Sequence, residues 1–489
     1  MSVQMRSPQS PNAQSPVTHP IEALTDPLLA EPTLADTLRQ RRIRLAQRFD
    51  HPVVLWSGQP QPRNFPANVY PFRPSSHFLY FAGLPLRNAA IRLSQGRLEL
   101  FKDDPSAASA LWHGAEATRE ALATQMGAEA AYPLAELAQR LEGAASIAVQ
   151  DPATRAEQSR LLGRSLDAGS QAQGLDGDLM RAIVELRLIH DGGAIAQMRR
   201  AAAATVAAHR AGMAATPEAT HEAAVRAAME QVIMAQGMTV AYSSIVTVHG
   251  EVLHNDQYHH PLQPEDLLLA DVGAEAASGW ASDVTRTWPV SGQFSPTQRD
   301  LYDLVLAAHD ACIEVMQPGV EYRDVHLLAA RIMADGLAQL GILRGHADDL
   351  VEMDAHALFF PHGIGHLLGL DVHDMEDLGD RAGYAEGRRR SDRFGLGYLR
   401  LDRPLQPGMI TTIEPGFYQV PAILNDPERR SRYQAVVNWD RLAQFADVRG
   451  IRIEDDVLVT EAGTEVITAA LPTQAEAIEQ MVQGGHSPT

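Results

Sequence analysis

Acidic side chains at the ends of short apolar stretches are the residues of this chain best placed for chemistry. In residues 267–289, LLLADVGAEAASGWASDVTRTWP, an apolar run that fits a strand covered on both faces turns charged at Asp271. On the strand that follows, Asp283 shares a face with Thr285 because side chains alternate. We interpret the segment as a hairpin with acids in its interior, which is costly unless they are protonated, hydrogen-bonded or bound to metal. Taken alone, they could equally be a turn acid and a surface acid.

Two later stretches place further acids on predicted strands. Residues 409–418, MITTIEPGFY, predict a strand that ends just after Glu414, where proline and glycine follow. Residues 450–460, GIRIEDDVLVT, predict a strand on which Arg452 and Glu454 share one face and apolar side chains take the other. Each of these strands alone could be an edge strand with solvated charges.

Histidines gather between these acids. Residues 359–374, FFPHGIGHLLGLDVHD, contain His362, His366 and His373. A zinc-protease helix would need glutamate after the first histidine, and the proline and glycines here argue against a regular helix. We therefore expect a loop or strand to position the rings. A single histidine is more often a packed core residue, but a trio flanked by glycines is harder to dismiss.

Together these residues predict a metal centre. Four carboxylates and an imidazole form a ligand set for a pair of fairly hard divalent ions, for which Mn²⁺ is more natural than structural zinc. Ions about 3.5–4 Å apart need bridging carboxylates and activate water. The sequence thus predicts hydrolytic chemistry at Asp271, Asp283, Glu414, Glu454 and a histidine.

Composition narrows the function classes. The chain has 489 residues, 45% of them hydrophobic, which predicts two or three globular domains. Its net charge of -20, from 41 basic and 61 acidic residues, argues against nucleic acid or an anionic membrane as a partner. The only cysteine, Cys312, has helical spacing and is expected in a core. With no signal-like start and no apolar run of about 18 residues, we expect a cytoplasmic protein.

The pattern of elements predicts two domains between two less regular ends. Residues 1–32 read as a flexible proline-rich arm, 33–179 as an N-terminal α/β domain, 180–470 as the catalytic domain, and 471–489 as a tail. In the first domain a helix from Leu34 precedes strands at 52–56, 89–93 and 98–101, without a phosphate-binding glycine loop. The aromatic stretch 68–84 is interpreted mainly as core.

The second domain shows a repeated order of helices and strands. Helices are expected at 194–213 and 220–236, then two short strands about Gly250 and the hairpin. Helices at 297–316, capped by Ser295 and Pro296, and at 322–340 then precede the later strands. This order suggests an internal pseudo-repeat.

Five motifs in order resemble the pita-bread metallopeptidases, within them the proline-specific branch of aminopeptidase P and prolidase. The motifs are YPFRPSSHFLYFAGL, DVGAE with SDVTRTWPVSGQFS, FFPHGIGHLLGLDVHD, LQPGMITTIEPGFY and RIEDDVLVT. The resemblance covers about residues 34–470. It implies an α+β fold, in which an N-terminal aminopeptidase-P-like α/β domain precedes a pita-bread catalytic domain with an internal pseudo-repeat.

The resemblance also implies residue roles. The metal ligands would be Asp271, Asp283, His366, Glu414 and Glu454, with Asp283 and Glu454 bridging two divalent ions, Mn²⁺ first and Zn²⁺ or Co²⁺ as alternatives. His254 and His373 would contact the substrate and the tetrahedral intermediate, and His362 would line the site. Arg452 and Tyr418 would orient ligands or relay protons, and Glu414 would also shuttle a proton. The Asp271–Asp283 spacing is one residue longer than in many relatives, and we place the extra residue near Gly279.

The implied reaction is hydrolysis of the Xaa-Pro bond that releases the first residue. Arg400 stands where prolidases carry the arginine that grips the proline carboxylate, with Arg403 as a competing candidate. We therefore favour a Xaa-Pro dipeptidase, with aminopeptidase P acting on longer peptides as the alternative and a catalytically silent binding protein as a third reading. Relatives imply a homodimer or homotetramer with the N-terminal domain as the contact.

Overall fold

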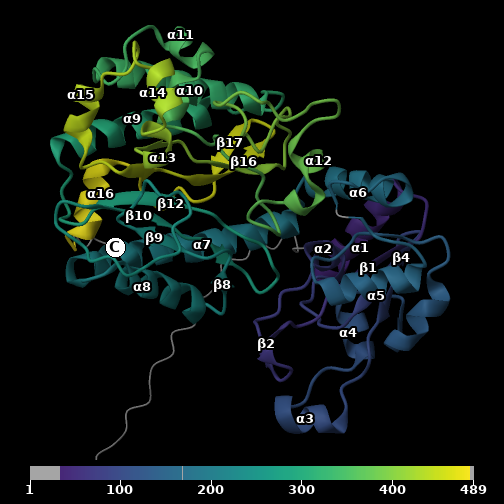
Figure 1. Cartoon of the computed structure of the whole chain (residues 1–489). Helices are drawn as coiled ribbons and strands as arrows, with labels where there is room; N and C mark the ends of the chain where they lie inside the picture. Colours follow the sequence, from purple (N-terminus) through teal and green to yellow (C-terminus); the bar gives the residue numbers. More distant parts are fainter. Residues whose placement is uncertain (1–32, 168, 485–489) are drawn as a thin grey trace, which may run out of the picture.

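The computed structural model describes residues 33–167 and 169–484. The predicted arm at 1–32 lies outside these residues. The described chain forms a smaller N-terminal domain and a larger C-terminal domain, the predicted catalytic domain, which lie side by side in Figure 1. Within this part of the chain, no helix is long and apolar enough to cross a membrane.

The N-terminal domain is built on a five-stranded sheet of order β6-β5-β4-β1-β7. Its strands are β1 (Val53–Trp56), β4 (Ala90–Ser94), β5 (Arg97–Phe101), β6 (Ala130–Tyr132) and β7 (Ala145–Ser146). The helices around it are α1 (Leu34–Ala46), α2 (Ser76–Ala82), α4 (Arg119–Gln125) and α5 (Pro152–Leu162). A small hairpin of β2 (Pro62–Phe65) and β3 (Asn68–Val69) and the short helix α3 (Ala107–His113) project from it. The expected α/β character of this domain is confirmed.

Helix α6 (Gly174–Arg187) joins the domains, and the boundary predicted at residue 180 falls inside it. It packs on α1 and β7 on one side and on α12 (Asp380–Gly383) of the catalytic domain on the other. Its last residue, Arg187, is almost fully buried. The two domains therefore share a packed interface along this helix.

The catalytic domain repeats the order of two helices followed by strands, as expected. The helices are α7 (Gly192–Ala215), α8 (Glu222–Ala235), α9 (Pro296–Val315) and α10 (Tyr322–Gln339). Their sheets have the orders β12-β10-β9, β13-β16-β17 and β14-β15. The strands are β9 (Ile245–Thr247), β10 (Leu267–Asp271), β12 (Thr285–Pro289), β13 (Ile410–Ile413), β14 (Gly416–Tyr418), β15 (Gly450–Arg452), β16 (Asp455–Thr460) and β17 (Gly463–Val466). Ser295 closes a capping box at the start of α9, and Cys312 of that helix is fully buried.

The central hairpin is confirmed, with one correction. β10 pairs with β12 in antiparallel register from Leu267–Pro289 to Asp271–Thr285. Asp283, however, lies just before β12 rather than on it, because its N–H donates to the carboxylate of Asp456 at 3.1 Å. The acid is therefore positioned by a side chain instead of by the ladder.

Two of the predicted acids were expected on strands but lie between strands, where the chain passes from one sheet to another. β13 pairs with β16, whereas β14 pairs with β15. The segments β13–β14 and β15–β16 therefore each pass from one sheet to the other, and they do so side by side. Glu414 lies between β13 and β14, and Glu454 lies between β15 and β16. The N–H of Glu454 donates to the carbonyl of Thr285 at 3.0 Å, which ties this crossing point to β12.

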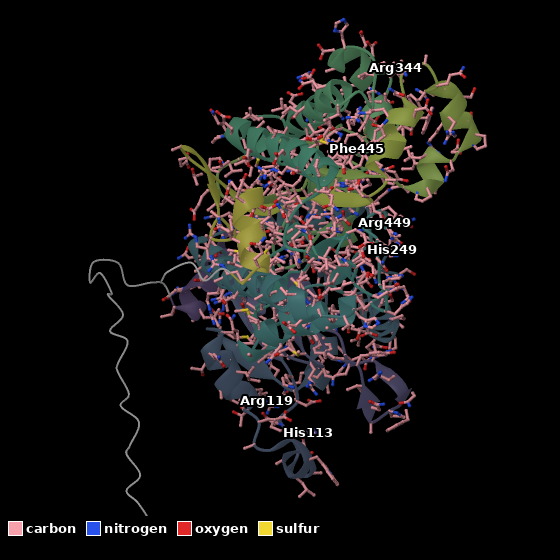
Figure 2. The ribbon with its side chains drawn as sticks, turned by 90° about the vertical axis from the view of Figure 1, so that its left-hand side faces the viewer. His113, Arg119, His249, Arg344, Phe445 and Arg449 are labelled. Atoms are coloured by element: carbon pink, nitrogen blue, oxygen red, sulfur yellow. The ribbon has the colours of Figure 1, made fainter. Side chains whose placement is uncertain are left out.

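Of the two strands predicted about Gly250, the first is confirmed as β9 and the second is wrong. The strands of that region are β8 (Thr239–Val240) and β9, and residues 248–254 form turns. A Cβ at Gly250 would lie 2.8 Å from the carbonyl oxygen of Gly450, so this turn is fixed by close backbone contact. Figure 2 shows the neighbouring pair His249 and Arg449 side by side.

The predicted tail is partly structured. Residues Ala475–Val482 form helix α16, which packs against α7, α9 and β12. Ile478 and Val482 are buried there. Residues 485–489 lie outside the described chain.

Candidate metal centre

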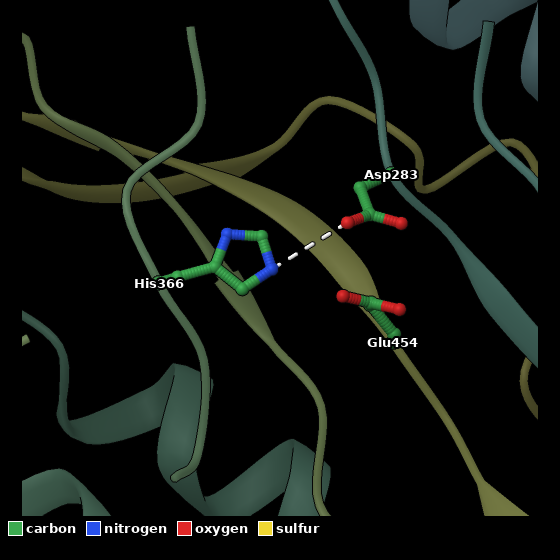
Figure 3. Close-up of side chains that lie close together, drawn as sticks. All are labelled: Asp283, His366 and Glu454. Atoms are coloured by element: carbon green, nitrogen blue, oxygen red, sulfur yellow. Dashed lines mark ion pairs between the residues drawn. The ribbon is translucent and has the colours of Figure 1, made fainter. Parts of the chain in front are cut away.

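Three of the predicted ligands meet closely. Asp283, His366 and Glu454 each offer a ligand atom, and these atoms lie within 4.8 Å of one another (Figure 3). They come from the approach to β12, from the histidine-rich loop and from the β15–β16 crossing. Nε2 of His366 lies 3.5 Å from Asp283 Oδ2 and 3.7 Å from Glu414 Oε1, which places a third acid beside them.

The His366 ring is oriented as a metal ligand requires. Its Nδ1–H donates to the carbonyl oxygen of Leu367 at 3.0 Å, so Nε2 keeps a free lone pair that faces the acids. Burial lowers the pKa of His366 and keeps the ring neutral. The loop reaches this position because Gly365 packs on β13, where a Cβ would lie 2.1 Å from the carbonyl oxygen of Thr412. The expectation of a loop rather than a helix is confirmed.

The acids of the cluster are electrostatically costly without a cation. Burial, followed by the charge of Asp271, raises the pKa of Asp283 to about 8. Burial also raises the pKa of Glu414 to about 7, and it raises that of Glu454 well above its usual range. Several carboxylate oxygens and one imidazole around this uncompensated negative charge fit a pair of divalent ions with a preference for oxygen ligands.

Hydrogen bonds hold two of the carboxylates in place. Thr285 Oγ1 donates to Glu454 Oε2 at 2.6 Å, and Arg452 Nε donates to the same threonine oxygen at 2.9 Å. A second guanidinium nitrogen of Arg452 lies 2.6 Å from Asp271 Oδ2. Arg452 therefore contacts Asp271 directly and Glu454 through Thr285.

Tyr242 is a site residue that the sequence reasoning missed. Its hydroxyl contacts both Asp271 Oδ1 and Asp283 Oδ1. Burial raises the pKa of this phenol well above its usual range, so it remains a hydrogen-bond donor. A tyrosine after an apolar pair has no spacing that distinguishes it from a core residue, so no signal in the sequence marks it.

A second chain of contacts runs behind the centre. Arg452 donates to the hydroxyl of Tyr418 at 3.0 Å, and this hydroxyl lies 2.9 Å from His362 Nε2. Nδ1 of His362 donates to the carbonyl oxygen of Gly363 at 2.8 Å, so Tyr418 donates to Nε2. Burial lowers the pKa of His362 to about 3, which keeps the imidazole neutral.

The remaining predicted residues surround a cavity of about 780 Å³ that opens on the acids. Its lining includes His254, His362, His373, Arg400 and Arg452 as well as all five predicted ligands. His373 packs edge-on against His366, with ring centroids 4.4 Å apart, and its Nδ1 lies 3.2 Å from Glu376 Oε2. His254 lies exposed at the rim.

Of the two arginine candidates, Arg400 lines this cavity. Its guanidinium forms an ion pair with Glu376. Arg403 instead donates to the backbone carbonyls of Arg381 and Tyr384, at 3.3 and 3.0 Å. Arg400 is therefore the better placed of the two to meet a ligand.

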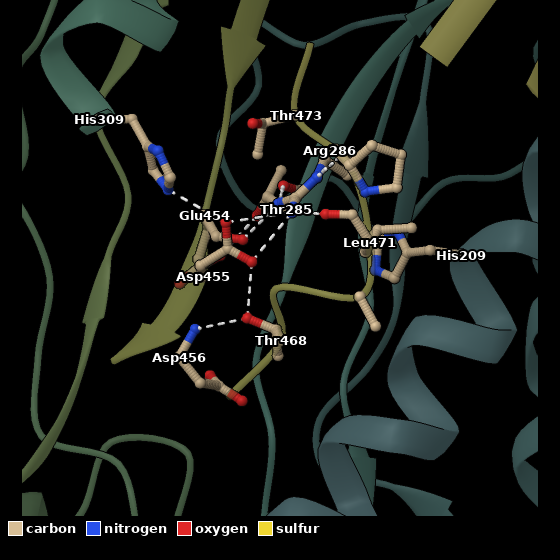
Figure 4. A network of polar contacts seen from close by, with 12 residues as sticks. His209, Thr285, Arg286, His309, Glu454, Asp455, Asp456, Thr468, Leu471 and Thr473 are labelled. Atoms are coloured by element: carbon tan, nitrogen blue, oxygen red, sulfur yellow. Dashed lines mark hydrogen bonds and ion pairs between the residues drawn. The ribbon is translucent and has the colours of Figure 1, made fainter. Parts of the chain in front are cut away.

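A separate ionic network surrounds Asp455, the residue that follows Glu454 (Figure 4). Arg286 lies 2.9 Å from Asp455 Oδ1, and His309 Nε2 lies 3.1 Å from Asp455 Oδ2. Thr468 donates to Asp455 at 2.6 Å. Arg286 also donates to the carbonyl of Glu454 at 2.6 Å, so this network fixes the backbone of a predicted ligand.

Comparison with known proteins gives two family matches. Residues 196–461 match the model of metallopeptidase family M24, and residues 38–150 match that of the aminopeptidase P N-terminal domain. The Xaa-Pro aminopeptidase of Escherichia coli is 30% identical over 91% of this chain and 96% of its own length. The human Xaa-Pro dipeptidase is 31% identical over 88% of both chains. A solved structure of E. coli aminopeptidase P with substrate aligns with a TM-score of 0.76 at 27% identity, covering 93% of this chain and 99% of that one.

Proposed function

The chain belongs to metallopeptidase family M24, in its aminopeptidase P and prolidase branch, and we propose that it hydrolyses the peptide bond before a proline at position two. The observation that carries this proposal is the buried cluster of Asp283, His366 and Glu454, with ligand atoms within 4.8 Å. A metallo-exopeptidase needs such a centre where a substrate can reach it, and the cluster lines a cavity of about 780 Å³.

Asp271, Asp283, His366, Glu414 and Glu454 would hold two divalent ions, with Asp283 and Glu454 shared between them. Such ions would lower the pKa of water and polarise the scissile carbonyl group, and Mn²⁺ fits the oxygen-rich set better than Zn²⁺ or Co²⁺. The chain's own groups support this chemistry. Arg452 and Thr285 fix ligand oxygens, and His366 presents its unprotonated Nε2.

The other polar groups would act on the substrate. His254 and His373 line the cavity beside the acids and are proposed to contact the peptide and the developing oxyanion. His362, whose Nε2 accepts from Tyr418, lines the site as a neutral ring. Glu414 is proposed to carry a proton to the leaving nitrogen of proline.

Selectivity for proline is proposed to come from apolar side chains in the same cavity. A Xaa-Pro bond has no N–H, so recognition must rest on the shape of the pyrrolidine ring. Leu253, Pro361, Val420 and Ile423 line the cavity together with the metal cluster. These apolar side chains can pack against the pyrrolidine ring without needing a hydrogen bond from it.

Peptide length separates two candidate functions. Arg400 on the cavity wall supports the predicted Xaa-Pro dipeptidase, because a guanidinium can bind the free proline carboxylate. The ion pair between Arg400 and Glu376 supports the second candidate, an aminopeptidase acting on longer chains, because it neutralises the guanidinium before any substrate arrives.

Activity assays test the shared function and separate the candidates. After chelation and addition of Mn²⁺, we expect release of the first residue from Ala-Pro dipeptide or from longer peptides that begin Ala-Pro. Inertness toward all of them would overturn the proposal and favour a silent binding protein. If Arg400 grips a carboxylate, Arg400→Ala loses activity on the dipeptide alone. Cytoplasmic location and a homodimeric or homotetrameric state remain predictions.

A further inference from the structure

A second cavity, of about 670 Å³, lies between the N-terminal domain and the catalytic domain. His373 and Glu376 line both this cavity and the one that ends on the metal cluster. The wall that faces them belongs to the N-terminal domain and includes Gln61, Tyr70 and Phe72. The two cavities therefore share a boundary next to the reacting centre.

The shared wall is held rigidly by residues of the interface. Arg187, 1% exposed, lies 2.6 Å from Asp374 Oδ1 and 3.3 Å from Asp371 Oδ2. His77 on α2 is 3.0 Å from Arg187 through Nδ1 and 3.0 Å from Asp377 through Nε2. These buried contacts fix segment 371–377, which carries His373 and Glu376, against the N-terminal domain. A wall built this way can bind a ligand without first becoming ordered.

We propose that this interdomain cavity binds the part of the substrate that follows the proline. This inference rests on the proposed Xaa-Pro hydrolysis. From the metal cluster, His366 packs on His373, His373 contacts Glu376, and Glu376 faces the second cavity. A dipeptide ends before this boundary, whereas the third and later residues of a longer peptide extend past Glu376, since each residue adds about 3.3–3.6 Å to an extended chain.

The lining also indicates which residues it prefers. The four acids of the lining already have partners: Asp371 pairs with Arg73 and Arg187, Asp377 with His77, and Glu376 with His373 and Arg400, while Asp151 accepts from the backbone at the start of α5. Tyr70, 53% exposed, and Phe72 add aromatic rings to the same wall, and the guanidinium of Arg63 already lies over the Tyr70 ring, 5.3 Å from its centroid. A wall with compensated charges and exposed aromatic surface favours apolar contact with the peptide over selection of a charge. The substrate class is therefore a peptide with proline second and an apolar or aromatic residue third or fourth.

The first test compares peptides that differ in length and in the third residue. With the Mn²⁺-loaded full chain, we expect a KM for Ala-Pro-Phe-Ala about two- to fivefold lower than for Ala-Pro-Gly-Ala, the range expected when one side chain is partly buried. Equal KM values for the two tetrapeptides, or turnover of Ala-Pro without turnover of either one, would overturn this inference and leave the proposed hydrolysis standing. Inertness toward every peptide would overturn both.

A variant of the wall gives the second test. Tyr70→Ala should raise the ratio of the tetrapeptide KM to the dipeptide KM about fivefold or more, whereas Trp112→Ala, an aromatic residue 78% exposed on α3 and outside the cavity, should leave that ratio unchanged. Calorimetric titration with the product peptide Pro-Phe-Ala provides a readout that needs no turnover, and its affinity should fall in Tyr70→Ala. An unchanged ratio and an unchanged affinity would contradict the assignment.

Discussion

Glu454 and Asp455 are neighbours in the chain, yet they face opposite regions of the molecule and carry opposite electrostatics. Toward the cavity, burial and the nearby carboxylates raise the pKa of Glu454 well above its usual range. On the other side burial acts in the same direction on Asp455, but Arg286 and His309 outweigh it and hold that pKa below its usual range. The scaffold region around Asp455 contains its own positive counter-charges. The metal region around Glu454 needs positive charge from bound ions.

The largest expected effect comes from removing a shared ligand. Asp283→Ala should lose hydrolysis by more than about 100-fold, beyond the range seen for residues that only support ligands, together with bound metal. Activity assays and metal analysis would check this, and circular dichroism would confirm that the domains remain folded. Retained activity would mean that the acids facing the cavity are not the centre.

On the scaffold side, the expected loss is in stability. Asp455→Ala leaves the guanidinium of Arg286 buried without its partner, and we expect the free energy of unfolding to fall by about 3–5 kcal/mol. Urea denaturation would measure it. The exposed pair Arg199–Glu465 provides the matched control, because Glu465→Ala should cost no more than about 1 kcal/mol. Similar losses in both variants would remove the distinction between the two regions.

A smaller effect is expected from a hydroxyl at the metal centre. Tyr242→Phe removes the contact to Asp271 and Asp283 without changing shape, and metal affinity should fall about 10–100-fold. Tyr258→Phe, whose hydroxyl donates to the carbonyl of Ser244 at 2.6 Å, is the control and should bind metal normally. Competition with a fluorescent chelator would give both affinities.

The smallest effect concerns pH. In the metal-free protein the pKa of Asp283, about 8, exceeds its unfolded value of about 4. The folded state therefore binds more protons than the unfolded state, and stability is present at low pH and lost as pH rises toward 8. Between pH 6 and 7 we expect a loss of about 1 kcal/mol, which bound metal should abolish. Thermal melts at fixed ionic strength would contradict this if stability rose over that interval.

The sequence indicated which acids gather around one cavity better than it indicated their backbone positions. Asp271 and Glu414 stood out because each ends an apolar strand, but a turn acid or an edge acid gives the same pattern, so their role as ligands came from the resemblance. The crossing at Glu454 could not be found, since one continuous alternating pattern covers both β15 and β16 while their partners differ. Tyr242 and Arg187 were not predicted for a related reason. Their roles depend on contacts between distant parts of the chain, which leave no periodic pattern in the local sequence.

The histidine loop carries one further consequence. His362 and His366 each donate Nδ1–H to the carbonyl of the residue that follows, Gly363 and Leu367. The main chain of the loop thus determines which nitrogen of each ring carries the proton. No side-chain replacement can remove the carbonyl acceptor. Alanine scanning around the centre would not detect these backbone acceptors. Substitutions in the loop leave them in place as long as the backbone path is unchanged.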